Sequence, residues 1–150
     1  MNPVSGAELR MIVDVAVAYL LALPVGWERE HHERSAGLRT FPLVCVASCG
    51  VVLAARYTMS RSDESRVIQG LIGGIGFIGG GTILRSGLTV HGTATAASIL
   101  MTAVIGVCVA QHLYLMAITL SVLSLVTLRL FQAWKMLENN PEPWTQRKSK

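Results

Sequence analysis

Charged side chains are scarce in this sequence of 150 residues. Asp, Glu, Lys and Arg together make up 15% of the chain, whereas hydrophobic residues make up 51%. Soluble domains usually carry roughly 25% charged residues, and the mean hydropathy of +0.48 is high for a chain that folds in water. These figures exclude an intrinsically disordered chain, a disulfide-rich secreted scaffold and a soluble cytosolic enzyme. They predict one domain embedded in a membrane.

The signatures of common enzyme classes are also absent. The sequence contains no Gly-Lys-Ser/Thr phosphate-binding loop, no His-Glu-x-x-His zinc motif and no Gly-x-Ser-x-Gly nucleophile elbow. The segments between its apolar blocks are too short to form a soluble catalytic domain. We therefore expect neither an enzyme nor a nucleic-acid-binding protein, and no bound cofactor.

Long apolar blocks dominate what is present. A helix needs about 20 mainly apolar residues to cross a bilayer. Five blocks approach that length, at residues 8–27, 41–58, 67–84, 94–110 and 112–131. The last two blocks adjoin at Gln111 and His112, and one straight helix through both would be roughly 57 Å long. We therefore predict an all-α polytopic membrane protein with about five transmembrane helices, the last two joined by a tight turn; four helices is the alternative.

The distribution of Lys and Arg predicts the orientation. Residues 1–131 form the predicted membrane domain, and residues 132–150 form a short basic tail. With five spans, nine basic residues share one side: Arg29, Arg34, Arg39, Arg85, Arg129, Lys135, Arg147, Lys148 and Lys150. The other side carries Arg10, Arg56, Arg61 and Arg66. Because Lys and Arg accumulate on the cytoplasmic side, we place the N-terminus outside and the tail in the cytoplasm, although three arginines around residue 60 are unfavourable on an outer loop.

Glycine is concentrated in the third block. Seven glycines fall within twelve residues: Gly70, Gly73, Gly74, Gly76, Gly79, Gly80 and Gly81. In lipid the backbone must satisfy its own hydrogen bonds, so the segment is expected to be helical despite its composition. Small residues four apart allow two helix backbones to approach closely. Since the glycines cover more than one face, we predict a central helix. Its glycines serve either tight packing within the chain, or a substrate path or oligomer seam.

A cluster of charges of both signs follows the first block. Glu28 and Arg39 lie at the predicted adjoining ends of two helices, so we predict an ion pair between them. Gly37 favours a turn, and Thr40 is a candidate N-cap for the next helix. Glu28 and Glu30 are candidate Mg²⁺ ligands, because magnesium prefers carboxylate oxygens. The alternative is a charge network within the loop.

Polar residues inside or beside the blocks mark further candidate sites. Asp14 lies about two turns into the first block, and an acidic residue at such a position marks a functional site by default. It either hydrogen-bonds to a neighbouring helix or serves an ion or proton pathway. Arg85 directly follows the glycine-rich block, and Thr95 lies in a hydroxyl-rich helix start, where hydroxyls cap helices and bond between them.

Several of these segments, taken in order, carry a family resemblance. The segments VGWERE, AGLRT, GLIGGIGFIGGGTILRSG and VHGTATAAS together resemble the membrane domain of the MgtC/SapB family, over residues 23–106. The matching motif positions are Glu28, Arg29, Gly37, Arg39, Thr40, Gly74, Gly76, Gly79, Gly81, Arg85, Gly92, Thr95, Ala96 and Ala97. Leu100 departs from the pattern, since relatives usually have a tryptophan there.

The resemblance implies a function in the bacterial inner membrane. It implies magnesium homeostasis or adaptation to low magnesium, and some family members inhibit the membrane ATP synthase. We therefore expect helix–helix contact with a membrane partner such as the ATP synthase, or with a second copy, within the lipid bilayer. The alternative is an oligomeric Mg²⁺ transporter or channel, in which Asp14 and the glycine-rich helix line the route.

Overall fold

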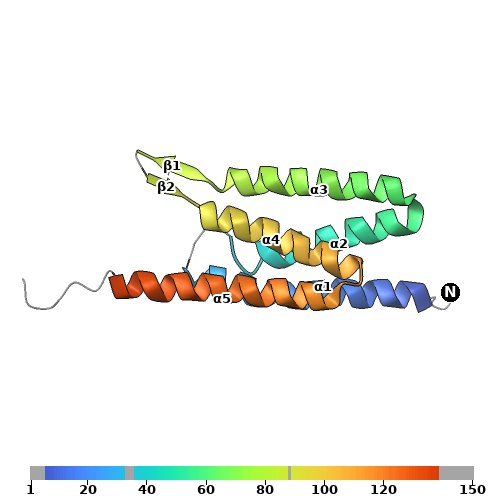
Figure 1. Cartoon of the computed structure of the whole chain (residues 1–150), viewed down its shortest axis with the longest axis horizontal. Coiled ribbons are helices and arrows are strands. Elements are labelled where there is room, and N and C mark those ends of the chain that lie inside the picture. The colour runs from blue at the N-terminus through green and yellow to red at the C-terminus, as the bar shows by residue number, and fades with distance from the viewer. Residues whose placement is uncertain (1–5, 33–35, 88, 139–150) are drawn as a thin grey trace, which may run out of the picture.

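The structure is a bundle of helices that run alternately in opposite directions (Figure 1). The computed structural model describes residues 6–32, 36–87 and 89–138. Within these ranges it contains five helices: α1 (Gly6–His32), α2 (Thr40–Thr58), α3 (Arg61–Gly81), α4 (Thr93–Ala110) and α5 (Tyr114–Glu138). The predicted all-α architecture and the tight turn between the last two helices are confirmed.

Three of the helices are long and apolar enough to cross a membrane. They are the stretches Gly6–Glu30, Thr40–Thr58 and Thr93–Ala110. α5 carries a shorter apolar stretch, Tyr114–Leu130. The chain is therefore an all-α protein with the helices of a membrane domain, and a topology of five spans stays a prediction.

α4 is the helix at the centre of the bundle. It packs against each of the other four helices, and its buried residues include Thr95, Ile99, Thr102, Ile105 and Val109. A helix that is apolar around its whole circumference is expected in such a buried position. The central position predicted for the glycine-rich helix is therefore wrong, because α4 occupies it.

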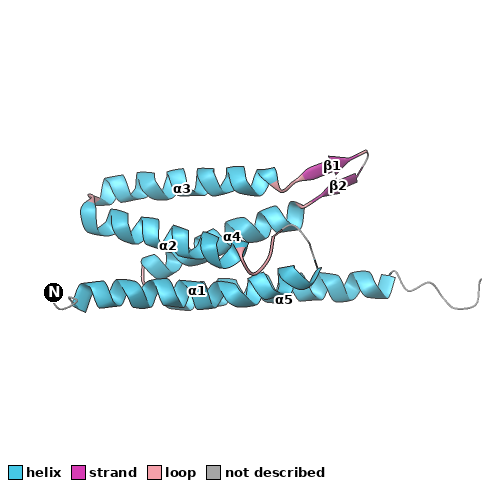
Figure 2. Cartoon of the chain, turned by 180° about the vertical axis from the view of Figure 1, so that it is seen from behind, coloured by secondary structure: helices cyan, strands magenta, loops and turns pink. Residues whose placement is uncertain are grey.

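The glycine-rich helix α3 lies at one edge of the bundle, as two opposite views show (Figures 1 and 2). It packs mainly on α4 and α2, and its buried residues are Ile75 and Gly79, four positions apart. The backbone of Ala96 lies against Gly79. Most of the other glycines face away from this contact and have no side chain with which to bury apolar area. α3 therefore buries only a narrow strip of its surface against the bundle.

α2 and α4 approach each other closely at Gly106. A Cβ atom added to Gly106 would lie 2.2 Å from the carbonyl oxygen of Cys45 and 3.1 Å from the backbone nitrogen of Cys49. Both cysteines are fully buried in the core around this contact. Close backbone packing, which the sequence suggests for α3, is thus also made by a glycine of α4.

A short β-hairpin joins α3 to α4 and was not predicted. Strands β1 (Leu84–Ser86) and β2 (Thr89–His91) pair antiparallel, with Arg85 opposite Val90. Gly92 follows with a φ of +88° and sits so close to the carbonyl of Thr82 that no side chain fits. The hairpin begins at Leu84, where the third apolar block was predicted to end.

Three other predicted boundaries differ from the structure, the first being that α1 runs to His32 rather than ending at residue 27. α3 begins at Arg61 rather than at residue 67, because the side chain of Ser60 accepts a bond from the N–H of Asp63 and caps a polar first turn. The predicted tail at 132–150 begins inside α5, which runs to Glu138. Residues 139–150 of that tail lie outside the described residues.

Candidate functional site

The first and last helices run parallel and are joined by polar contacts at three levels. The donors on α5 lie 100 or 101 residues after their acceptors on α1. The contacts are Tyr114 Oη to Asp14 Oδ1 at 2.6 Å, Ser121 Oγ to the Leu21 carbonyl at 2.7 Å, and Arg129 Nε to Glu28 Oε2 at 2.9 Å. The α1 members are seven residues apart, which is about two helical turns, so they share one face.

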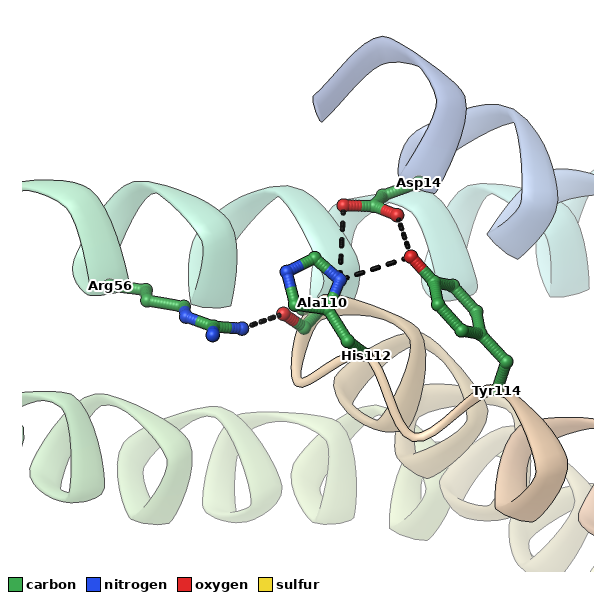
Figure 3. Close-up of polar contacts among 5 residues, drawn as sticks. All are labelled: Asp14, Arg56, Ala110, His112 and Tyr114. Carbon is green, nitrogen blue, oxygen red and sulfur yellow. Dashed lines mark hydrogen bonds and ion pairs between the residues drawn. The ribbon is translucent and has the colours of Figure 1, made fainter. Parts of the chain in front are cut away.

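Asp14 is the centre of the first level. Its side chain is buried, at 2% exposure for the residue. The Tyr114 hydroxyl donates to one carboxylate oxygen, and Nδ1 of His112 lies 3.6 Å from the other and 3.0 Å from the hydroxyl (Figure 3). The structure therefore shows Asp14 bonded to a neighbouring helix, one of the two roles considered for it; it also lines an open pocket of about 440 Å³ with Arg10.

His112 takes an unusual backbone conformation to reach this cluster. Its φ is +59°, the only positive φ of a non-glycine residue in the described part of the chain. A left-handed residue other than glycine costs about 1–2 kcal/mol. Its N–H bonds to the carbonyl of Val109 at the end of α4. Neither His112 nor Tyr114 was singled out from the sequence, because nothing local to the turn indicates that Asp14 lies beside it.

At the opposite end of α1, Glu28 and Arg29 point to different helices. α1 continues to His32, so both residues lie within the helix. The buried Glu28 accepts from Arg129 of α5, and the buried Arg29 donates through Nη2 to the hydroxyl of Thr95 at the start of α4. Two residues that are neighbours in sequence thus tie α1 to two different helices.

The predicted pair of Glu28 with Arg39 is wrong. Arg39 is exposed and occupies the N-cap position of α2, whereas Glu28 lies on the face of α1 that meets α5. The predicted capping role of Thr40 is also wrong, because Thr40 is the first helical residue and no side chain caps α2.

The Glu30 side chain stabilises the connection between α1 and α2 through a hydrogen bond. Its Oε2 accepts the N–H of Leu38 at 3.0 Å, and a Cβ at Gly37 would lie 1.8 Å from that oxygen. The carbonyl of Gly37 in turn accepts from the N–H groups of Thr40 and Phe41. The predicted turn at Gly37 is confirmed, and a side chain at this position would displace the Glu30 carboxylate from its bond to Leu38.

The two candidate magnesium ligands have separate partners. Glu28 bonds to α5 and Glu30 to the connection after α1. Over the described ranges, no three side chains of His, Cys, Asp or Glu gather into a group that could hold a metal ion. The geometry thus favours structural bonds for both carboxylates. Arg85 is exposed on β1, where its Nε donates to the Gly87 carbonyl at 3.1 Å.

Replacing Arg129 tests the ion pair assigned between Arg129 and Glu28. We expect Arg129→Gln to lower the unfolding free energy by about 0.2–1 kcal/mol, because the Arg129 side chain is 65% exposed and solvent screens the pair. Arg39→Gln is the matched control and should have no effect. Thermal unfolding of the purified protein in detergent measures both. Equal losses in the two variants would contradict the assignment.

Several predicted site residues lie on the outer face of α3, where the described chain provides no packing partner for them. Gly74, Gly76, Gly80 and Gly81 are exposed, and a Cβ added to any of them would meet no atom within 4 Å. Phe77, on the same outer face, is 86% exposed. Among the predicted site residues, the structure thus buries Asp14, Glu28, Arg29, Gly37, Gly79 and Thr95, while the other glycines of α3 face outward.

Comparisons with known proteins agree with the motifs. The sequence matches the MgtC family over residues 15–137. It is 36% identical over 115 residues to an uncharacterised protein of Synechocystis, covering 77% of this chain and 49% of that protein. It is 39% identical over 93 residues to a Brucella abortus protein named MgtC, covering 62% of this chain and 39% of that one.

A Salmonella typhimurium protein, also named MgtC, is similar to the same degree. The identity is 38% over 96 residues, covering 64% of this chain and 41% of the relative. The chain thus spans half or less of the length of these curated relatives. No solved structure matches the chain.

Proposed function

The chain belongs to the MgtC family, and from that premise we propose that it is a regulator in the bacterial inner membrane that supports adaptation to low magnesium. It acts by contact between the outer face of α3 and the membrane helices of another protein. The exposure of the glycines on α3 is the observation that supports this proposal. The match to the family over residues 15–137 supports the membrane setting and the link to proteins named MgtC.

The outer face of α3 has the properties of a helix-docking surface. Gly73 and Gly80 lie seven residues apart, on one side of the helix, and Phe77 lies between them along the chain. All three are exposed. In lipid, helices associate through close packing rather than through the hydrophobic effect, and glycine permits the closest approach. A flanking phenylalanine adds a large contact surface.

Seven glycines would be a poor choice for a helix that met only lipid. Each glycine in a helix interior costs about 1 kcal/mol relative to alanine in peptides in water. Within the described chain, Gly79 alone of these glycines is placed against a neighbouring backbone, that of Ala96. The other glycines of α3 bring no packing benefit to the folded monomer, which favours a partner outside it.

The proposed partner is a protein with membrane helices such as the ATP synthase. The proposed orientation follows from the basic residues: the α1–α2 connection, the hairpin and the end of α5 lie at one end of the bundle (Figure 2). That end carries Arg29, Arg39, Arg85 and Arg129. We assign it to the cytoplasm because Lys and Arg accumulate there.

Filling the docking surface should separate function from folding. We expect the double variant Gly73→Leu/Gly80→Leu to keep the thermal stability of the parent but to lose rescue of growth at low magnesium in a deletion strain. The leucines would hold the partner helix away from α3. Gly50→Leu is the matched control, since Gly50 is a membrane-helix glycine on α2 with open space around it.

Other outcomes point elsewhere. Rescue by the double variant would overturn the docking proposal. A photo-crosslinker at residue 77 should capture the partner's membrane helix; capture of a second copy would indicate an oligomer instead. Magnesium flux into liposomes that is lost in Asp14→Asn would favour the transporter, which the bonded state of Asp14 does not support.

A further inference from the structure

A second pocket lies at the bundle end where α2 turns into α3. Its volume is about 470 Å³. It is lined by Arg56 and Met59 of the α2 end, Arg61, Glu64, Ser65 and Ile68 of α3, and Gln111 after α4. None of these side chains serves the docking surface of α3 or the contacts between α1 and α5. The pocket is therefore independent of the function proposed above.

The pocket offers guanidinium donors that the fold leaves available. Arg56 uses Nη1 to donate to the carbonyl of Ala110 at the end of α4, at 2.8 Å, which holds the guanidinium in place (Figure 3). A guanidinium has five N–H donors, so most of those of Arg56 remain. Arg61 is exposed and forms no ion pair in the described part of the chain.

The acidic residue of the pocket is already bonded. Oε1 of Glu64 accepts a hydrogen bond from the side-chain amide of Gln111. Two arginines and one carboxylate leave a net positive lining, while the exposed Asp63 and Arg66 outside the lining offset each other in charge on the same helix. The chemistry recognised by such a lining is a phosphate, which arginine binds with two parallel hydrogen bonds.

The composition of the lining favours a phosphate attached to a lipid. Met59 and Ile68 line the pocket together with the polar groups, so the lining combines apolar and polar side chains. A free phosphate would gain nothing from the apolar side chains. The position at a helix end, next to the exposed apolar surface of the bundle, is where a phospholipid headgroup would lie.

We propose that this pocket binds the phosphate of an anionic phospholipid. The proposal also accounts for arginines at an end of the bundle that the distribution of basic residues assigns to the outside. Bound headgroup phosphate neutralises the lining and links the α2–α3 turn to the end of α4, because Arg56 contacts both the headgroup and Ala110.

Lipid-dependent stabilisation tests the proposal. The full chain is purified in a neutral detergent, and thermal unfolding is measured with added phosphatidylglycerol, phosphatidylcholine or inorganic phosphate. Phosphatidylglycerol should stabilise the protein, and the other two should not. Arg61→Gln should bind phosphatidylglycerol about tenfold more weakly, because one charge-assisted pair is lost, while Arg39→Gln, an exposed arginine at the opposite end, should bind like the parent.

Each alternative result contradicts the proposal in a distinct way. Equal stabilisation by both lipids would show that charge is not recognised. Equal losses in Arg61→Gln and Arg39→Gln would show general attraction to the basic protein. Stabilisation by inorganic phosphate alone would indicate a free anion. Arg61 is exposed and holds no other helix, so its variant should fold, and lipid retained in native mass spectrometry provides a second readout.

Discussion

Gly106→Ala should destabilise the protein more than alanine at any glycine on the outer face of α3. The added Cβ would lie 2.2 Å from the carbonyl oxygen of Cys45, so α2 and α4 would have to move apart. Overpacking of a well-packed core costs about 1–3 kcal/mol and occasionally more. The obstructing atoms, the carbonyl oxygen of Cys45 and the nitrogen of Cys49, belong to the backbone, so no side-chain rotation relieves the contact. We therefore expect a loss in the upper part of this range.

Gly74→Ala provides the matched control for this experiment. Its Cβ would meet nothing within 4 Å, and alanine has the higher helix propensity. We expect unchanged or slightly higher thermal stability in detergent. A Gly106→Leu variant should not assemble at all and should be degraded or aggregate. If Gly106→Ala and Gly74→Ala unfold at the same temperature, the close approach of α2 and α4 is not present in the protein.

The second large effect is expected at Thr95. Its hydroxyl accepts a hydrogen bond from the guanidinium of Arg29, and both residues are buried. Thr95→Val keeps the size and shape of the side chain but removes the acceptor. Hydrogen bonds to charged groups contribute about 1.5–3 kcal/mol, and we expect a loss in unfolding free energy of that size.

Thr102→Val controls for the loss of a buried hydroxyl on the same helix. The Thr102 hydroxyl bonds to the Ser98 carbonyl within α4, so its removal leaves no partner on another helix unsatisfied. Identical losses in Thr95→Val and Thr102→Val would contradict the assigned bond between α1 and α4.

The sequence predicts well those features that depend on local composition. The apolar blocks locate the helices, and the length limit imposed by a bilayer separates α4 from α5 at Gln111 and His112. Helix ends are less predictable, because the polar first turn of α3 rests on a cap at Ser60 rather than on apolar residues. The hairpin has no buried apolar face that a sequence pattern could indicate, since the strand residues of β1 and β2 are exposed.

The site is less predictable, because its partners are distant in sequence. Glu28 and Arg39 appear as partners when proximity is judged along the chain, yet the partner in space is Arg129. The spacing of Asp14 and Glu28 by fourteen residues does place them on one face, which indicates a shared neighbour but not its identity. For the glycines, composition indicates where helices can approach closely. It does not distinguish Gly106, which lies against the backbone of α2, from Gly74, where an added Cβ would meet open space.

The pairing of α1 with α5 has a consequence for biosynthesis. α1 emerges from the ribosome before α5, and Tyr114 follows Asp14 by 100 residues. At a translation rate of 5–20 residues per second, the carboxylate therefore waits about 5–20 s for its donor. During that interval the Asp14 carboxylate lies in an apolar helix without the Tyr114 hydroxyl that donates to it. The packing of α1 is therefore completed only after α5 has been made.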